Sequence, residues 1–163
     1  MIQIQSFRGT ITMIDDFWIS EDKKDTGCYK LMSVENEYGN ILNFIVTPAT
    51  YFVNHVMVRV GDMVTGFYNK NAPVPLIFPP QLHAIVMARD TQYQNVKVDY
   101  FNSQLLSGDG QLKLNIGPYT RIELENGQAF TKNPANRNLI VIYGATTRSI
   151  PAQTTPYKII VMC

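Results

Sequence analysis

The sequence contains few of the residues that build reactive or metal-binding centres. Its 163 residues include two histidines, two cysteines and one tryptophan. His55 and His83 have no ligand-type residue at the spacings of a metal site, so ordinary strand positions are expected. Cys28 and Cys163 lie far apart and lack an adjacent basic residue that would favour a thiolate. Both are expected to be structural thiols, with one disulfide between them left open, and no metal or other cofactor is predicted.

The sequence also lacks a membrane-spanning segment and a strong excess of charge of one sign. No apolar run approaches the roughly 18 residues of a membrane-spanning helix, and the start, MIQIQSFRGT, has no basic segment before an apolar core. The formal net charge is +1, with seven Lys and Arg against nine Asp and Glu in residues 1–90 and seven against four in residues 91–163. Neither half has the basic surface that a protein relying on phosphate contacts requires. We therefore predict a cytoplasmic protein with no membrane contact.

Motifs of catalytic sites are missing as well. The chain has no G-x-S-x-G elbow, no glycine-rich phosphate loop and no dinucleotide fingerprint. The segment DDFWISEDKKD, residues 15–25, holds five carboxylates but lacks the alternating spacing of a calcium loop, so we expect a solvated loop. The protein is therefore predicted not to be an enzyme, and no catalytic residue is assigned.

β-Strand signals, by contrast, run through most of the chain. Val, Ile, Thr, Tyr and Phe gather in short segments that Gly, Asn and Asp separate. Helical periodicity is nearly absent, and residues 47–52 could form one helical turn or remain extended. Strands are expected at residues 7–14, 28–34, 40–47, 55–60, 63–68, 82–88, 95–101, 111–116, 121–130 (as a hairpin), 138–144 and 158–163.

The two halves of the chain resemble each other. NFIVTPATYF (43–52) aligns with KLNIGPYTRI (113–122) at an offset of 70, which matches Thr50 with Thr120. DMVTGFYNKNAP (62–73) aligns with RNLIVIYGATTR (137–148) at an offset of 75, and at that same offset Val86 falls on Val161. These matches predict an internal duplication, with a linker near the polar segment RDTQYQN (89–95).

The order of the expected strands carries a resemblance to a known fold. FRGTITMI gives a long, bent first strand with Gly9 at the bend, LMSVENEYGNILNFIV gives a hairpin, and RVGDMVTGFY leads through a tight turn into a fourth strand. Together they resemble the OB-fold barrel over residues 4–89, and a shorter version covers 95–163, although the usual helix after the third strand is missing or reduced. The predicted fold is all-β, with OB-like β-barrels as two tandem related units at residues 1–90 and 91–163, or with both fused into one domain. The resemblance implies binding of oligonucleotides, oligosaccharides or proteins.

Two proline-containing loops are the predicted contact surfaces. NAPVPLIFPP (71–80) and ATTRSIPAQTTPY (145–157) each join the last two strands of their unit, and each places apolar residues beside proline. Stiff loops lose little entropy on binding, so protein contact or self-association is expected, with burial over the chain's own barrel as the competing interpretation. Trp18 is a further candidate on the first loop. The predicted binding residues are Trp18, Pro75, Leu76, Ile77, Phe78, Pro79, Arg148, Ile150 and Pro151.

The alternative function is binding of single-stranded nucleic acid, or of an oligosaccharide, on the OB-like face, and nucleic acid is a partner that we do not favour. Tyr29, Lys30, Tyr38 and Phe44 could supply stacking and charge on the face of the second and third strands. Nearby carboxylates would repel phosphates. Arg148 beside Ser149 could bind an anion, although hydroxyl groups in such loops usually satisfy their own backbone.

Overall fold

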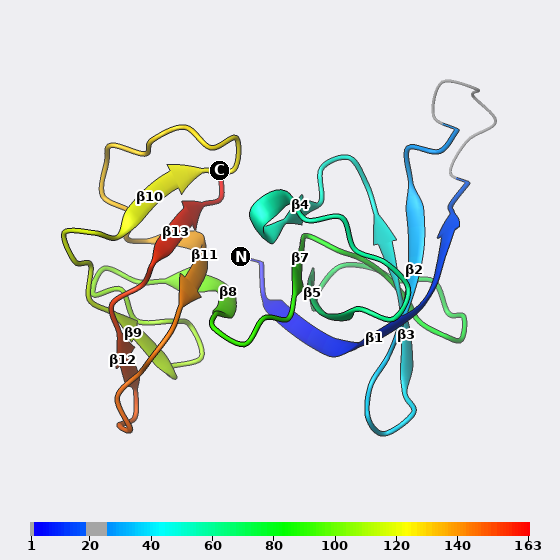
Figure 1. The fold of residues 1–163 in the computed structure, drawn as a ribbon, viewed down its shortest axis with the longest axis horizontal. Coiled ribbons are helices and arrows are strands. Elements are labelled where there is room, and N and C mark those ends of the chain that lie inside the picture. Colours follow the sequence, from blue (N-terminus) through cyan, green and yellow to red (C-terminus); the bar gives the residue numbers. More distant parts are fainter. Residues whose placement is uncertain (1, 19–25) are drawn as a thin grey trace. The chain divides into compact units, whose positions relative to one another are not determined.

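The computed structural model describes residues 2–18 and 26–163, and strands dominate it (Figure 1). The only helical element within these ranges is a short 3₁₀ turn, η2 (Val53–His55). No helix in the described ranges is long and apolar enough to cross a membrane. The predicted all-β class is confirmed. The chain divides into two compact units, residues 1–90 (unit 1) and residues 91–163 (unit 2).

Unit 1 contains one seven-stranded sheet in the order β4-β7-β5-β1-β2-β3-β6. Its long first strand pairs antiparallel with both β2 and β5. Two short strands pair in parallel, β6 with β3 and β4 with β7. The strands are β1 (Ile4–Asp16), β2 (Lys30–Glu35), β3 (Ile41–Val46), β4 (Tyr51–Phe52), β5 (Met63–Asn69), β6 (Gln81–His83) and β7 (Val86–Arg89).

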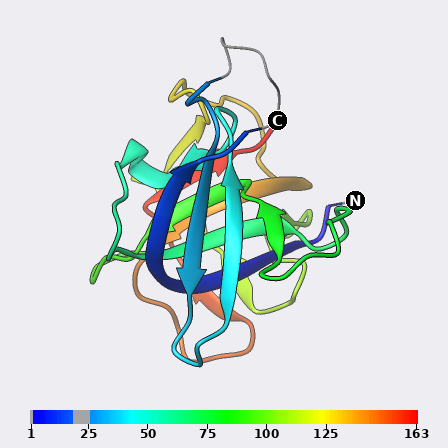
Figure 2. The same ribbon diagram turned by 90° about the vertical axis from the view of Figure 1, so that its right-hand side faces the viewer.

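The link between β6 and β7 hydrogen-bonds to strands from different places in this sheet. The Ala84 amide donates to the Ile45 carbonyl in β3 at 3.0 Å, and the Ile85 amide donates to the Phe67 carbonyl in β5 at 2.8 Å. In Figure 2, β1, β2 and β3 lie side by side in front of the green strands, which cross behind them. The buried core of unit 1 consists of Ile11, Met32, Val34, Leu42, Phe44, Val46, Val58, Val64, Ala84 and Met87.

Two glycines allow close approaches within unit 1. A Cβ atom at Gly9 would lie 2.3 Å from the carbonyl oxygen of Glu35, so only glycine lets β1 and β2 meet there. A Cβ atom at Gly66 would lie 2.3 Å from the ring of Phe44, which is fully buried. Both glycines therefore set how closely the strands of unit 1 pack.

Unit 2 contains a four-stranded sheet in the order β10-β13-β11-β8 and a two-stranded sheet of β12 and β9. Its buried core consists of Phe101, Leu112, Leu114, Leu139, Val141, Ile159 and Val161. The strands are β8 (Asn95–Phe101), β9 (Leu112–Leu114), β10 (Arg121–Leu124), β11 (Arg137–Tyr143), β12 (Ala152–Thr154) and β13 (Lys158–Val161).

The strand pairings of unit 1 recur in unit 2. The antiparallel pairs β1–β5 and β5–β7 have counterparts in β8–β11 and β11–β13. The parallel pairs β3–β6 and β4–β7 have counterparts in β9–β12 and β10–β13. These four pairings recur in the same order along the chain, whereas β2, which pairs with β1 and β3 in unit 1, is replaced in unit 2 by the isolated bridges Phe101–Ser107 and Leu106–Lys113.

A threonine makes equivalent hydrogen bonds in each unit. Thr50 Oγ1 accepts the amide hydrogen of the residue three positions earlier at 3.0 Å and donates to the Ala84 carbonyl oxygen at 2.8 Å. Thr120 Oγ1 does the same at 3.1 Å and donates to the Pro156 carbonyl oxygen at 2.8 Å. These bonds agree with the offset of 70 expected from the sequence.

The offset expected for the last strand is wrong. Phe67 pairs with Val86 in unit 1, and Ile142, which lies 75 positions after Phe67, pairs with Lys158 in unit 2. Lys158 therefore corresponds to Val86, at an offset of 72, and Val161 does not. Apolar runs match one another at several offsets, whereas the hydrogen-bond register fixes one of them.

Two expected elements also differ from the structure. Residues 56–59 form no strand, because Asn54 and His55 adopt positive φ angles of 61° and 51° and interrupt the extended backbone. The expected loop at 145–157 contains strand β12, which pairs in parallel with β9. Residues 47–52, for which a helical turn and an extended segment are both left open by the sequence, form a turn followed by the extended strand β4.

Candidate functional site

The connection from β5 to β6, residues 70–80 (the β5–β6 loop), exposes its apolar side chains. Leu76 is fully exposed, Phe78 is 87% exposed and Ile77 is 49% exposed. Pro75 is also exposed, while Pro79 is half-buried. The side chains of Leu76 and Phe78 therefore do not pack over the strands of unit 1, whereas Ile77 and Pro79 are partly covered.

Backbone hydrogen bonds anchor both ends of the β5–β6 loop. At its start, the Lys70 amide donates to the Gln3 carbonyl at 2.7 Å. At its end, the Pro80 carbonyl accepts the Asn43 amide hydrogen at 2.9 Å. Three prolines between these anchors, together with Pro80 itself, restrict the backbone further. The loop thus presents apolar groups from a segment held on both sides.

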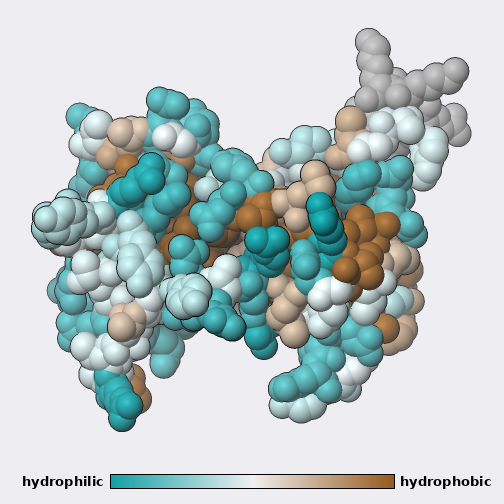
Figure 3. Space-filling view, viewed as in Figure 1, coloured by the Kyte–Doolittle hydropathy of each residue, from teal (hydrophilic) through white to brown (hydrophobic). Residues whose placement is uncertain are grey.

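The connection from β11 to β12, residues 144–151 (the β11–β12 loop), exposes fewer apolar groups. Ile150 is 87% exposed, Arg148 is exposed and Pro151 is half-buried. The tip of this loop lies at the bottom of Figure 1, and Figure 3 shows both teal and brown residues there. Figure 3 also shows a larger brown patch on unit 1, whereas the visible face of unit 2 is mainly teal and white with smaller brown areas.

Hydroxyl groups in the β11–β12 loop are used locally. The Thr147 and Ser149 hydroxyls are 2.7 Å apart, and Ser149 Oγ donates to the Pro151 carbonyl oxygen at 2.8 Å. Thr147 Oγ1 also accepts the Gln153 amide hydrogen at 2.9 Å. Ser149 is therefore committed to the loop, and the loop's own bonds do not assemble an anion site around Arg148.

Trp18 lies apart from the β5–β6 loop along the chain. Its side chain is 68% exposed just after the end of β1, where Asp16 pairs with Lys30. The loop instead follows Asn69, which pairs with Ile4 at the start of β1. The two candidates thus flank opposite ends of that strand. Most of the acidic segment predicted as a solvated loop, residues 19–25, falls outside the described residues.

The nucleic-acid alternative loses its central stacking residue. Phe44 is fully buried in the core of unit 1 and cannot stack on a base, so that expectation is wrong. Arg8 Nε donates to Asp90 at 2.8 Å, and the hydrogen bond and charge of Asp90 raise the pKa of Arg8. Lys30 is paired with Asp16. Carboxylates therefore already occupy two cations that could bind phosphate.

Metal and thiol chemistry gain no support from the geometry. Within residues 2–18 and 26–163, no group of three or more His, Cys, Asp or Glu side chains could hold a metal ion. His55 packs edge-on against Tyr51, with ring centroids 5.5 Å apart. Cys28 and Cys163 are both exposed, and no disulfide joins them.

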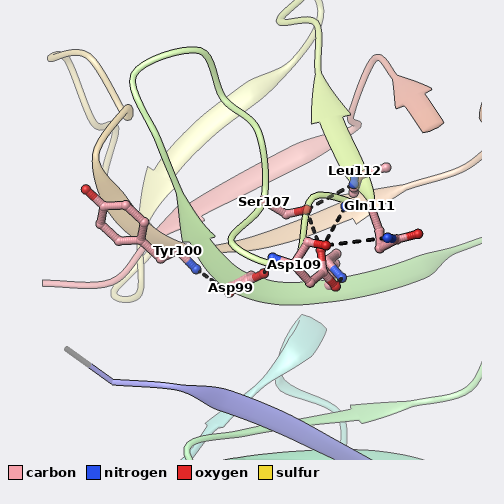
Figure 4. Close-up of polar contacts among 7 residues, drawn as sticks. Asp99, Tyr100, Ser107, Asp109, Gln111 and Leu112 are labelled. Carbon is pink, nitrogen blue, oxygen red and sulfur yellow. Dashed lines mark hydrogen bonds and ion pairs between the residues drawn. The ribbon is translucent and has the colours of Figure 1, made fainter. Parts of the chain in front are cut away.

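A turn at the start of β9 gathers acidic and hydroxyl groups (Figure 4). Asp109 accepts hydrogen bonds from Ser107 Oγ at 2.6 Å and from the Gln111 amide at 3.0 Å, and it pairs with Lys97. Burial disfavours the charged form of Asp109, but these hydrogen bonds and the Lys97 charge outweigh it and lower its pKa. Ser107 is buried and accepts the Leu112 amide hydrogen at 2.9 Å, so the cluster holds a turn rather than a reactive serine.

Unit 2 also carries an open cleft that the sequence does not predict. It has a volume of about 480 Å³ and is lined by Asn115, residues 144–147, residues 153–155 and Tyr157. These residues come from the end of β9, the β11–β12 loop, β12 and the segment before β13. Most of them lie in the segment 145–157, which the sequence predicts as a contact surface, but no motif in that segment indicates a cleft.

Compared with models of protein families, with curated proteins and with solved structures, the chain has no significant match.

Proposed function

We propose that the chain is a non-catalytic binding or assembly module that contacts another protein chain through the β5–β6 loop. The observation that carries the proposal is the exposure of Leu76 and Phe78 on a segment anchored at both ends. Full burial of each side chain would contribute roughly 1.5–3 kcal/mol, and the prolines reduce the entropy lost on binding. Exposed apolar groups that gather in this way mark contact surfaces more often than isolated ones do.

A second copy of the chain is the partner we propose first. Residues 1–90 carry two more acidic than basic residues (nine against seven), and residues 91–163 carry three more basic than acidic residues (seven against four). Opposite charges on the two units favour head-to-tail contact between copies. The β11–β12 loop, which exposes Ile150, would supply the second contact surface on each copy.

We further propose that unit 1 is an OB-like barrel. Supporting this are the antiparallel pairs β1–β2, β2–β3 and β1–β5, the parallel pair β3–β6, and the antiparallel pair β5–β7. The hydrogen bonds of Ala84 and Ile85 to β3 and β5 support a sheet that closes on itself. In such a barrel the β5–β6 loop would be the connection between the fourth and fifth strands.

Light scattering of the full chain tests the self-association proposal. The parent should form dimers or larger species as its concentration rises, and the double variant Leu76→Ser with Phe78→Ser should remain monomeric. At concentrations low enough to keep the parent monomeric, both should melt at the same temperature, because neither side chain contributes to the core. Tyr93→Ser, which changes another exposed aromatic residue, is the matched control and should assemble like the parent. A parent that is monomeric at every concentration, or a double variant that still assembles, would overturn the proposal.

A further inference from the structure

We infer that the cleft of unit 2 binds a neutral, polyhydroxylated ligand, of the kind that a sugar residue represents. The volume of about 480 Å³ falls within the range of about 300–1,000 Å³ typical of small-molecule sites. The inference concerns unit 2 alone and does not depend on the β5–β6 loop.

Most side chains that line the cleft are of polar types, and none is charged. Its side chains are threonines, two amides and a tyrosine, together with Gly144 and Ala145. A charged ligand entering it would lose hydration without gaining an ion pair from these walls. Hydroxyl and amide groups both donate and accept hydrogen bonds, which suits a ligand that itself carries several hydroxyl groups.

Several of these polar groups remain available to a ligand. Asn115 Nδ2 donates to Gln153 Oε1 at 3.1 Å. This bond leaves Asn115 Oδ1 able to accept, and Gln153 Nε2 able to donate, a hydrogen bond with a ligand. Within the described residues, no intramolecular hydrogen bond uses the hydroxyls of Thr146, Thr155 or Tyr157. The half-exposed ring of Tyr157 adds an apolar face against which the C–H groups of a sugar ring can pack.

The walls of the cleft are fixed by hydrogen bonds before a ligand arrives. Thr154 Oγ1 donates to the Ala145 carbonyl at 2.8 Å, and the Thr147 amide donates to the Gln153 carbonyl at 2.9 Å. These bonds tie the β11–β12 loop to β12. Tyr157 lies against Gly144, where a Cβ atom would come within 2.2 Å of the phenol oxygen. A glycine at position 144 therefore sets the position of the tyrosine ring.

Unit 1 shows that the fold does not require a polar lining at this place. Thr154 pairs with Leu114 in unit 2, and Leu82 pairs with Phe44 in the corresponding strands of unit 1. Thr154 is therefore equivalent to Leu82, and Asn115, which follows Leu114, is equivalent to Ile45. Ile45 and Leu82 are apolar, and Ile45 is buried. At these two positions unit 2 carries hydrogen-bonding groups where unit 1 carries hydrocarbon side chains, whereas Gln153 corresponds to a polar residue, Gln81, in the same registers.

A titration followed by ¹H–¹⁵N NMR on the full chain tests this inference. The probes are three neutral trisaccharides that differ in linkage or in substitution: maltotriose, cellotriose and N,N′,N″-triacetylchitotriose. At least one should give saturable shifts at up to about 10 mM, concentrated on the amides of residues 144–147 and 153–157. Absence of saturable shifts with all three, or equal shifts of the same amides with inorganic phosphate, would overturn the inference.

Two variants and one control locate the binding. Tyr157→Ala removes the aromatic face, and Gly144→Ala displaces the tyrosine ring, so each should weaken binding at least about tenfold. Tyr119→Ala changes a tyrosine of unit 2 that is 93% exposed and lies outside the cleft, and it should bind like the parent. Spectra that are unchanged away from the cleft verify the fold of each variant. Unaltered affinity in both cleft variants would place the ligand elsewhere and refute the inference.

Discussion

Unit 1 and unit 2 fill corresponding core positions with different pairs of side chains. Phe44 packs over Gly66 in unit 1, and the strand registers place Leu114 and Val141 at the equivalent positions of unit 2. One unit therefore combines a large and a minimal side chain, and the other combines two of intermediate size. A shared backbone arrangement requires that the core be filled, but several combinations of side chains can fill it.

The close approach of the first two strand segments also differs between the units. In unit 1 the glycine is Gly9 on β1, and it faces the backbone of Glu35. In unit 2 the glycine is Gly108 on the opposing segment, where a Cβ atom would lie 3.1 Å from the Asp99 carboxylate of β8. The glycine that allows the two segments to approach therefore lies on the first segment in unit 1 and on the second segment in unit 2. The backbone arrangement, rather than any one residue, is what the two units have in common.

The largest expected effect comes from making the two cores alike. Gly66→Val should destabilise unit 1 by about 3 kcal/mol, because the new side chain overlaps the ring of Phe44. Adding Phe44→Leu reproduces the pair found in unit 2 and should restore at least half of that loss. Thermal unfolding, with hydrogen exchange to assign the change to unit 1, measures both effects. A double variant no more stable than Gly66→Val alone would show that the two cores are not interchangeable.

The core comparison also shows what could be predicted from the sequence. Segments such as NLIVIYG and FRGTITMI are recognisable as strands because apolar, β-branched residues cluster in them. The equivalence of Thr50 in unit 1 and Thr120 in unit 2 is also predictable from the sequence, because both lie in segments that share a proline and a threonine. The register of the last strand is not predictable in this way. The β5–β6 loop is three residues longer than the β11–β12 loop, and the apolar runs of β7 and β13 can be aligned at more than one offset.

Short, polar elements were beyond sequence analysis for a different physical reason. β12 is three residues long and contains Gln153 and Thr154, so nothing in its composition distinguishes it from a loop. It forms a strand because the tertiary structure brings it beside β9, with which it pairs in parallel. The unit 2 cleft depends on this same pairing, and it therefore became visible only in the structure. Phe44 was assigned to a surface because alternation alone does not say which face of a strand is buried.

An intermediate effect is expected from the threonine that each unit uses in the same way. Thr50→Val and Thr120→Val should each destabilise their own unit by about 2 kcal/mol, because each leaves an amide and a carbonyl without the hydroxyl that joins them. The Thr→Ser variants keep the hydroxyl and serve as controls. Hydrogen exchange resolved by unit should show matching losses. A large loss for one threonine and none for the other would break the equivalence of the two turns.

The smallest expected effect concerns stability in acid, and it distinguishes the turn at Asn36 in unit 1 from the turn at Asp109 in unit 2. In unit 1 the Asn36 side chain accepts the Tyr38 and Asn40 amide hydrogens at 3.0 Å and 2.9 Å. In unit 2 Asp109 accepts the Gln111 amide hydrogen, so a carboxylate takes the place of a neutral amide. Only the turn of unit 2 should therefore depend on pH in the acid range.

Asp109→Asn tests this difference, because it gives unit 2 the same kind of turn as unit 1. The folded pKa of Asp109 lies below its ordinary value of 3.8, so ionised Asp109 adds stability above that value, and the addition disappears as the pH falls through the folded pKa. The loss at neutral pH should be no more than about 1 kcal/mol, because the side chain is 46% exposed and solvent screens its pairing with Lys97. Unfolding temperatures of the parent and the variant should therefore differ at pH 7 and converge as the pH falls below 3.8 and through the folded pKa of Asp109. Asn36→Asp is the reciprocal variant, and it should introduce an acid-dependent term into unit 1. A difference between the parent and Asp109→Asn that stays constant across this range would show that the charge of Asp109 does not contribute, and that its hydrogen bonds alone hold the turn.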